Sequence, residues 1–194
     1  MYLIFDTETT GFPNEKVSPD DPSQARIVQL AFVLLDEHLN EKAAYSTLVH
    51  PKGKWQVPTG AQAVHGISTK DCEKYGAPNE VVMSAFDAAW NSSKKRVAHN
   101  IAFDKKLVNI ERWLINAREP YSWSEGTICT MELMTPICKL PNKNGRAGYK
   151  WPKLSEAYKH VTGQELQGAH DALADVRGCV TVLKWLVANR HVQL

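Results

Sequence analysis

Apolar residues occur along this chain in two patterns, as short continuous runs and as stripes at helical spacing. The first half contains three runs typical of buried strands, because each ends at a turn signal. They cover 2–6, about 26–35 and about 43–49. The polar segment 14–24, which contains two prolines, is typical of a surface loop. The first half therefore predicts a meander of three strands.

The second half alternates between helical stripes and short apolar runs. The side chain of Asn100 is expected to cap the helix that follows it. Strand–helix alternation after a meander predicts a mixed α/β sheet with helices on its faces. The predicted elements are helices at 79–90, from 101, at 154–161 and at about 171–189, and short strands at 96–98 and 127–130.

Two carboxylates leave one face of the first predicted strand. Asp6 and Glu8 are two residues apart, so their side chains point to the same side of the strand. An unpaired buried carboxylate is costly, and two neighbours repel each other unless a cation lies between them. Hard oxygen ligands of this kind favour a divalent metal ion.

Two further carboxylates occupy positions near the core faces of predicted helices. Asp175 is the polar member of an otherwise apolar stripe, and a salt bridge to a buried Arg or Lys would explain it equally well. Asp104 follows Phe103, and taken alone it fits an exposed first-turn aspartate that favours the helix dipole. Together with Asp6 and Glu8, however, these acids come from three separate elements, which favours two hard divalent ions.

His170 precedes Asp175 by five residues and follows Gly168. A lone histidine is usually structural or on the surface, but a histidine close to metal ligands suits a general base that activates water. Two metal ions about 4 Å apart can stabilise both the attacking and the leaving oxygen of a phosphoryl centre. This combination predicts phosphodiester hydrolysis.

Composition sets bounds on these hypotheses. A chain of 194 residues has the length of one domain, and we expect a single domain over 1–194. No apolar stretch reaches the roughly 20 residues of a membrane span, and no signal peptide is expected. The four cysteines are far apart, which predicts free thiols and a cytoplasmic protein. A net charge of +2 does not by itself predict nucleic-acid binding.

Three segments resemble, in order and spacing, the motifs of the DEDDh exonuclease family. They are FDTETTG at 5–11, VAHNIAFD at 97–104 and HDALADV at 170–176, the last with the His-x4-Asp spacing of the DEDDh branch. The family includes the proofreading subunit of bacterial replicative polymerases. The three motifs together are highly specific and span most of the chain.

The resemblance implies a ribonuclease-H-like fold with a mixed five-stranded sheet flanked by helices. It also implies a 3′→5′ exonuclease that uses two Mg²⁺ or Mn²⁺ ions and releases nucleoside monophosphates. By motif position, the implied metal ligands are Asp6, Glu8, Asp104 and Asp175. His170 would be the general base, and Glu8 would also orient the water. The implied substrate contacts are Thr9, Thr10, Gly11, Phe12, His65 and Asn100. For Phe12 and His65, ordinary packing explains the sequence equally well.

Two features depart from the family motifs or lie outside them. Asp171 stands where several relatives have glycine, and we interpret it as a helix cap and not as a further ligand. The basic segment 139–153 could follow a single-strand backbone, with Tyr149 or Trp151 stacking on bases. A solvated surface loop is the favoured interpretation of that segment, because charge runs usually lie on the surface.

Three alternative functions remain. An actin-like or sugar-kinase phosphate loop would need glycine at Glu8 and a longer chain. A nucleic-acid-binding module without activity would have lost a carboxylate, and all four are present. The same chemistry on RNA stays open, although the motif at 6–11 resembles the DNA branch more closely. The expected partner is a single-stranded 3′ end, with DNA favoured over RNA, and a DNA polymerase could associate in trans.

Overall fold

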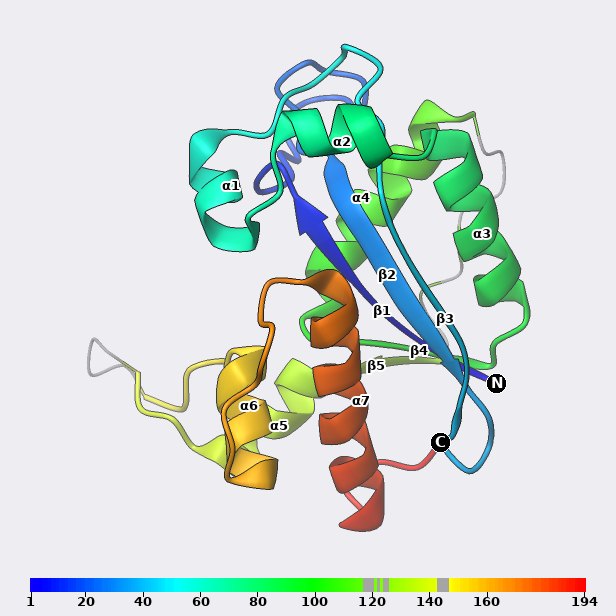
Figure 1. Ribbon diagram of the computed structural model, residues 1–194. Helices are drawn as coiled ribbons and strands as arrows, with labels where there is room; N and C mark the ends of the chain where they lie inside the picture. Colours follow the sequence, from blue (N-terminus) through cyan, green and yellow to red (C-terminus); the bar gives the residue numbers. More distant parts are fainter. Residues whose placement is uncertain (117–120, 122, 124–125, 143–146) are drawn as a thin grey trace.

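The computed structural model describes residues 1–116, 121, 123, 126–142 and 147–194. Its centre is a five-stranded sheet with the strand order β3-β2-β1-β4-β5 (Figure 1). Neighbours β1, β2 and β3 are antiparallel, whereas β4 and β5 run parallel to β1. The predicted mixed sheet is therefore confirmed. The strands are β1 (Tyr2–Thr9), β2 (Ile27–Leu35), β3 (Glu41–Leu48), β4 (Lys95–Ala98) and β5 (Thr127–Cys129).

Seven helices lie in the described part of the chain, and four of them were predicted. These four are α3 (Asn79–Asn91), α4 (Ile101–Leu114), α6 (Leu154–Thr162) and α7 (Ala172–Ala188). The prediction missed α1 (Thr59–His65), α2 (Thr69–Tyr75) and α5 (Thr130–Cys138). Helix α1 buries no residue, so it carries no apolar stripe, and α5 contains Pro136, which normally argues against a helix.

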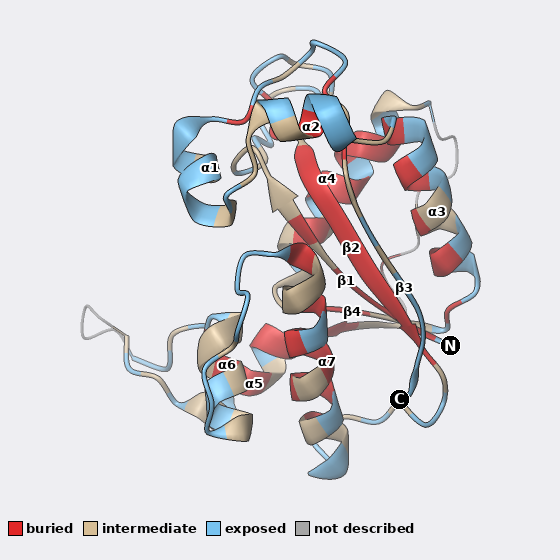
Figure 2. Cartoon of the chain, viewed as in Figure 1, coloured by how far each residue is buried: buried red, intermediate tan, exposed pale blue. Residues whose placement is uncertain are grey.

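The two faces of the sheet carry separate apolar cores. Along β1, Leu3 and Phe5 pack in the core that includes residues of α3 and α4, whereas Tyr2 and Ile4 pack against α7. Every residue of β2 is buried, as Figure 2 shows, because helices cover the sheet on both sides. Two faces covered in this way fix which side each residue of β1 presents, including those at its C-terminal end.

Asn100 occupies the predicted N-cap position of α4, but the side-chain capping hydrogen bond predicted for it is absent. Asn100 has a left-handed backbone with φ 73°, and its side chain makes no capping hydrogen bond to α4. The cap predicted at Asp171 is confirmed, because its carboxylate accepts the Ala174 N–H at 3.0 Å. Strand β1 also continues to Thr9, beyond the predicted end at Asp6.

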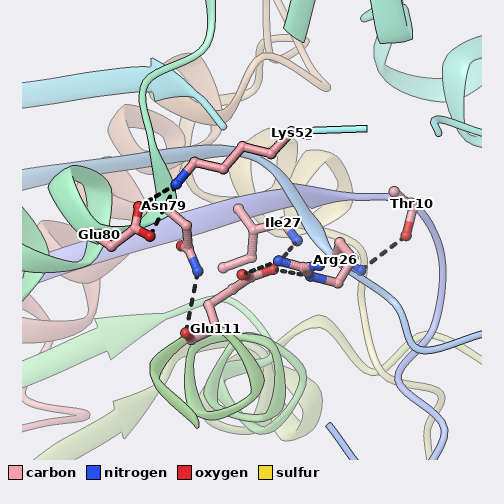
Figure 3. Close-up of polar contacts among 7 residues, drawn as sticks. All are labelled: Thr10, Arg26, Ile27, Lys52, Asn79, Glu80 and Glu111. Carbon is pink, nitrogen blue, oxygen red and sulfur yellow. Dashed lines mark hydrogen bonds and ion pairs between the residues drawn. The ribbon is translucent and has the colours of Figure 1, made fainter. Parts of the chain in front are cut away.

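A buried ion pair holds the chain where β1 ends and β2 begins (Figure 3). Glu111 of α4 accepts two hydrogen bonds from the Arg26 guanidinium, both at 2.8 Å, and a third from the Ile27 N–H at 3.0 Å. Arg26 in turn donates its backbone N–H to Thr10 Oγ1 at 2.9 Å and accepts the Thr10 N–H at 2.9 Å. Helix α4 is thereby tied to the turn that follows β1.

Loss of this ion pair should destabilise the fold strongly. Glu111→Leu would leave the Arg26 charge largely buried without its partner, and we expect it to cost about 3–5 kcal/mol of unfolding free energy. Glu80→Leu is the matched control, because Glu80 pairs with Lys52 at an exposed position (Figure 3) and should cost about 1 kcal/mol or less. Urea denaturation measures both values, and equal losses would contradict this account.

Candidate active site

Strand β1 delivers two carboxylates to the C-terminal end of the sheet. Asp6 and Glu8 follow Tyr2 and Ile4 in the alternation along the strand, so they face the side of the sheet covered by α7. In the register with β2, Glu8 lies opposite Gln29, and a bulge follows between Glu8 and Thr9. Both carboxylates are partly buried.

Thr7 attaches Asp104 to the same strand end. Its hydroxyl donates to Asp104 Oδ1 at 2.7 Å, and both residues are buried. The bond joins the first turn of α4 to β1. The exposed first-turn position that Asp104 alone suggested is therefore wrong. This contact of Thr7 was not predicted, although the position of Thr7 between Asp6 and Glu8 placed it next to the site.

Gln29 attaches the start of α7 to strand β2. Its side-chain oxygen accepts the Ala172 N–H at 3.2 Å, and its nitrogen donates to Asp171 Oδ2 at 3.4 Å. Since Gln29 lies opposite Glu8, the first turn of α7 is held beside the end of β1. Gln29 was also missed, because a glutamine in an apolar run gives no signal of a contact so distant in sequence.

The first turn of α7 brings Asp175 and His170 to Glu8. Asp175 Oδ2 accepts the backbone N–H of His170 at 3.0 Å, and His170 has a left-handed backbone with φ 72°. Glu8, His170 and Asp175 each offer a ligand atom, and these atoms all lie within 4.8 Å of one another. Residues far apart in sequence thus meet as the motif spacing predicted.

The four carboxylates lie in a site where burial and mutual repulsion disfavour their charged forms. Burial, together with Asp104 and Asp175, raises the pKa of Asp6 well above its usual range. Burial and the neighbouring Asp175 raise the pKa of Glu8 to about 8. Burial also raises the pKa of Asp104 to about 7, against the hydrogen bond from Thr7. Burial raises the pKa of Asp175 as well.

No Lys or Arg among the described residues forms an ion pair with any of these four acids. The salt bridge considered for Asp175 is therefore absent from the described part of the structure. Clustered oxygen donors with this excess of negative charge match the preferences of Mg²⁺ and Mn²⁺. The donor set therefore fits divalent cations.

The predicted substrate contacts surround the end of β1 in different ways. Thr9 Oγ1 donates to the Gly11 carbonyl at 2.8 Å, which shapes the turn. The Thr10 hydroxyl accepts the backbone N–H of Arg26. Phe12 is 87% exposed and forms an edge-to-face contact with Phe103, at 5.8 Å between ring centroids, so it is not a core residue.

His65 and Asn100 lie partly buried. His65 is the last residue of α1 and accepts the Ile67 N–H on Nδ1 at 3.1 Å. Its Nε2 is buried against the backbone of Thr9 outside good hydrogen-bond geometry, and burial lowers the pKa of this imidazole. Asn100 lies between β4 and α4, four residues before Asp104.

Comparison with known proteins identifies the class. The RNase_T family, described as exonuclease, matches residues 3–183, and the chain belongs to this family of phosphodiester hydrolases. The uncharacterized exonuclease CP81 of Escherichia phage 186 is 29% identical over 182 residues, which cover 90% of this chain and 82% of that protein.

Solved structures confirm the ribonuclease-H-like exonuclease fold. E. coli exonuclease I in complex with a dT13 oligonucleotide has a TM-score of 0.77 and 20% identity, over 95% of this chain and 40% of that chain. Exonuclease I without ligand has a TM-score of 0.78 and 19% identity, over 98% of this chain and 43% of that chain. This chain therefore spans about two fifths of the length of exonuclease I.

Two further expectations concern the chain as a whole. No helix within the described ranges is both long and apolar enough to cross a membrane. All four cysteines are free, as their spacing predicted.

The raised pKa values predict how the metal-free protein responds to pH. The folded-state values of Glu8 and Asp104, about 8 and about 7, exceed the unfolded values near 4. The native state therefore binds more protons between about pH 4 and 8, and its stability falls as pH rises through this window. We expect Asp104→Asn to raise the melting temperature in EDTA at pH 8 by roughly 3–6 °C, and by much less at pH 5.

Mg²⁺ should reverse the order, because it would stabilise the wild type more than the Asp104→Asn variant. Asp36→Asn is the control, since hydrogen bonds from Asn40 hold the pKa of the partly exposed Asp36 at about 2 and loss of this carboxylate should not stabilise the protein. Differential scanning calorimetry measures these shifts. A wild-type melting temperature independent of pH from 5 to 8 in EDTA would contradict the raised pKa values.

Proposed function

We propose that this protein is a metal-dependent 3′→5′ exonuclease of the DEDDh branch that removes nucleoside monophosphates from single-stranded or frayed DNA ends. The observation that carries the proposal is the meeting of Asp6, Glu8, Asp104 and Asp175 at the end of β1, with His170 on the adjoining loop. The His170-x4-Asp175 spacing supports the branch, and membership of the exonuclease family supports the class of reaction.

The four carboxylates would hold two Mg²⁺ or Mn²⁺ ions. When bound, such ions stabilise charge on a phosphoryl group and lower the pKa of water. Asp104 is buried and would be the most rigid ligand, since the Thr7 hydroxyl fixes one of its oxygens. Glu8 and Asp175 would complete the set on the side that faces His170.

His170 would take the proton from the attacking water. Its side chain is exposed, so a substrate can reach it, and its backbone N–H is held by Asp175. Glu8 would orient that water, because its carboxylate lies within 4.8 Å of the ligand atoms of His170 and Asp175. The arrangement gives the acid–base work to the imidazole of His170 and leaves the carboxylates to hold the cations.

Single-stranded DNA is the substrate we favour. Phe12 offers an exposed ring beside the Thr9–Gly11 turn, and base–aromatic stacking is a common way to hold a terminal nucleotide. E. coli exonuclease I, which shares the fold, was crystallised with dT13 and dA16 oligonucleotides. Contacts to a 2′-hydroxyl decide between RNA and DNA, and RNA trimming is the alternative that the assay below must separate.

The remaining proposals concern organisation. We propose that 1–194 forms one exonuclease domain, and that any DNA polymerase partner would associate in trans. Four free cysteines support a cytoplasmic location.

The first test is cleavage of matched DNA and RNA oligonucleotides labelled at either end. We expect Mg²⁺-dependent shortening from the 3′ end, faster on DNA, and no cleavage by Asp6→Asn, because that variant removes a ligand and keeps the shape. Asp21→Asn, at a loop aspartate with only local Ser23 contacts, is the control. Wild-type activity in Asp6→Asn, or no cleavage of either strand by wild type, would overturn the proposal.

The second test addresses the general base. His170→Ala should bind oligonucleotide and Mg²⁺ like the wild type but lose about 100-fold or more in kcat. The control is His38→Ala, at a histidine whose side chain is 78% exposed and which lies in the turn between β2 and β3. Steady-state kinetics across pH give the readout, and an unchanged pH–rate profile in His170→Ala would exclude the base role.

A further inference from the structure

A segment between α5 and α6 leaves the body of the molecule. We name the described residues 139–142 and 147–153 the basic arm; Lys143 and Arg146, part of the basic segment seen in the sequence, lie outside the described residues. Pro141 and Tyr149 form an antiparallel bridge, and the Lys150 N–H donates to the Leu140 carbonyl at 3.0 Å. Figure 1 shows this segment extending away from the sheet beside α6. Its two sides therefore form a defined ribbon.

The basic arm presents two aromatic rings to solvent. Tyr149 is 46% exposed and Trp151 is 67% exposed. Neither ring stacks on another aromatic ring among the residues that the structure describes. Exposing large aromatic surface is unfavourable, and neighbouring exposed aromatics commonly mark a binding surface.

The charge of the basic arm favours a polyanion. Lys139 and Lys153 are exposed, and neither forms an ion pair within the described ranges. Lys150 is different, because it is paired with Glu156 at 2.6 Å and contributes little free charge. The sequence from 139 to 153 contains no acid. Cations interleaved with aromatic rings are the features that bind single-stranded nucleic acid.

A histidine connects the basic arm to the candidate active site. His99 Nε2 lies 2.9 Å from the Pro152 carbonyl, and its Nδ1 lies 3.0 Å from Thr130 Oγ1. His99 directly follows β4 and immediately precedes Asn100, and Asp104 lies in the first turn of the helix that follows. Trp151 and Lys153 flank Pro152 in sequence, so the contact with His99 holds the backbone of this end of the basic arm beside the segment that leads from β4 to Asp104.

We propose that the basic arm binds the single strand a few nucleotides before its 3′ end, with Trp151 stacking on a base and Lys153 contacting the backbone. This inference rests on the proposed function, because it assumes that a 3′ end enters the site at β1. The basic arm would then favour long strands over short ones.

Binding without metal tests the proposal apart from cleavage. Fluorescence anisotropy in EDTA compares a twelve-nucleotide and a three-nucleotide DNA strand, both labelled at the 5′ end. We expect Trp151→Ala to raise Kd for the longer strand about tenfold, as loss of one base–aromatic stack does, and to leave Kd for the shorter strand unchanged. Trp113→Ala is the matched control, since Trp113 is 51% exposed near the end of α4 away from Asp104.

Salt dependence tests the charge. Lys153→Ala should reduce the slope of log K against log salt by about 0.7 for the longer strand. Lys184→Ala, at an exposed lysine of α7, should leave the slope unchanged.

The proposal would be overturned if Trp151→Ala and Trp113→Ala changed Kd equally, or if Trp151→Ala changed Kd equally for both strand lengths. A basic arm that binds a protein partner instead would leave Kd unchanged for both strands, which would also overturn the proposal. Wild type that binds the longer strand through Trp151 yet cuts no oligonucleotide with Mg²⁺ would overturn the proposed function alone. The two failures are therefore distinguishable.

Discussion

Mutual repulsion of four carboxylates at the end of β1 is the constraint on which this structure depends. Burial and neighbouring charge raise the pKa values of Asp6, Glu8, Asp104 and Asp175. Without cations, this cluster opposes folding at neutral pH, because each acid must either stay protonated or remain charged at a cost. The covered sheet, with an apolar core on each face, supplies the stability that keeps the cluster in place.

Helix α4 contains two buried carboxylates that the structure accommodates in different ways. Glu111 and Asp104 are two turns apart on the same helix, and both are buried. Glu111 is neutralised by Arg26, and it ties α4 to the chain after β1. Asp104 instead accepts a hydrogen bond from the neutral hydroxyl of Thr7. The contrast separates a structural acid from a proposed metal ligand within one helix.

The sequence predicted the parts of the fold that repeat at short range. Strand β2 and helix α7 carry apolar patterns that only a covered sheet and its packed helix explain, and the four acids and His170 stood in recognisable motifs. Helix α1 was missed because it buries nothing, and the side-chain cap expected at Asn100 is absent because this residue has a left-handed backbone in place of the extended one typical of an N-cap. Gln29 and Thr7 could not be assigned, since their contacts join residues more than ninety positions apart, and only tertiary structure brings them together.

Hydrogen bonds from neutral groups explain how the site can be held in place and still keep its negative charge. Thr7, Gln29 and the backbone N–H of His170 all bind the acidic elements through neutral groups, so position is fixed without adding a competing cation. The remaining negative charge is then available to whatever binds between β1, α4 and α7. Divalent ions would therefore act both as chemical groups and as part of the fold, because their binding free energy would add to stability wherever the folded state alone forms the site. Metal binding and the stability of the fold at the end of β1 would then be thermodynamically linked.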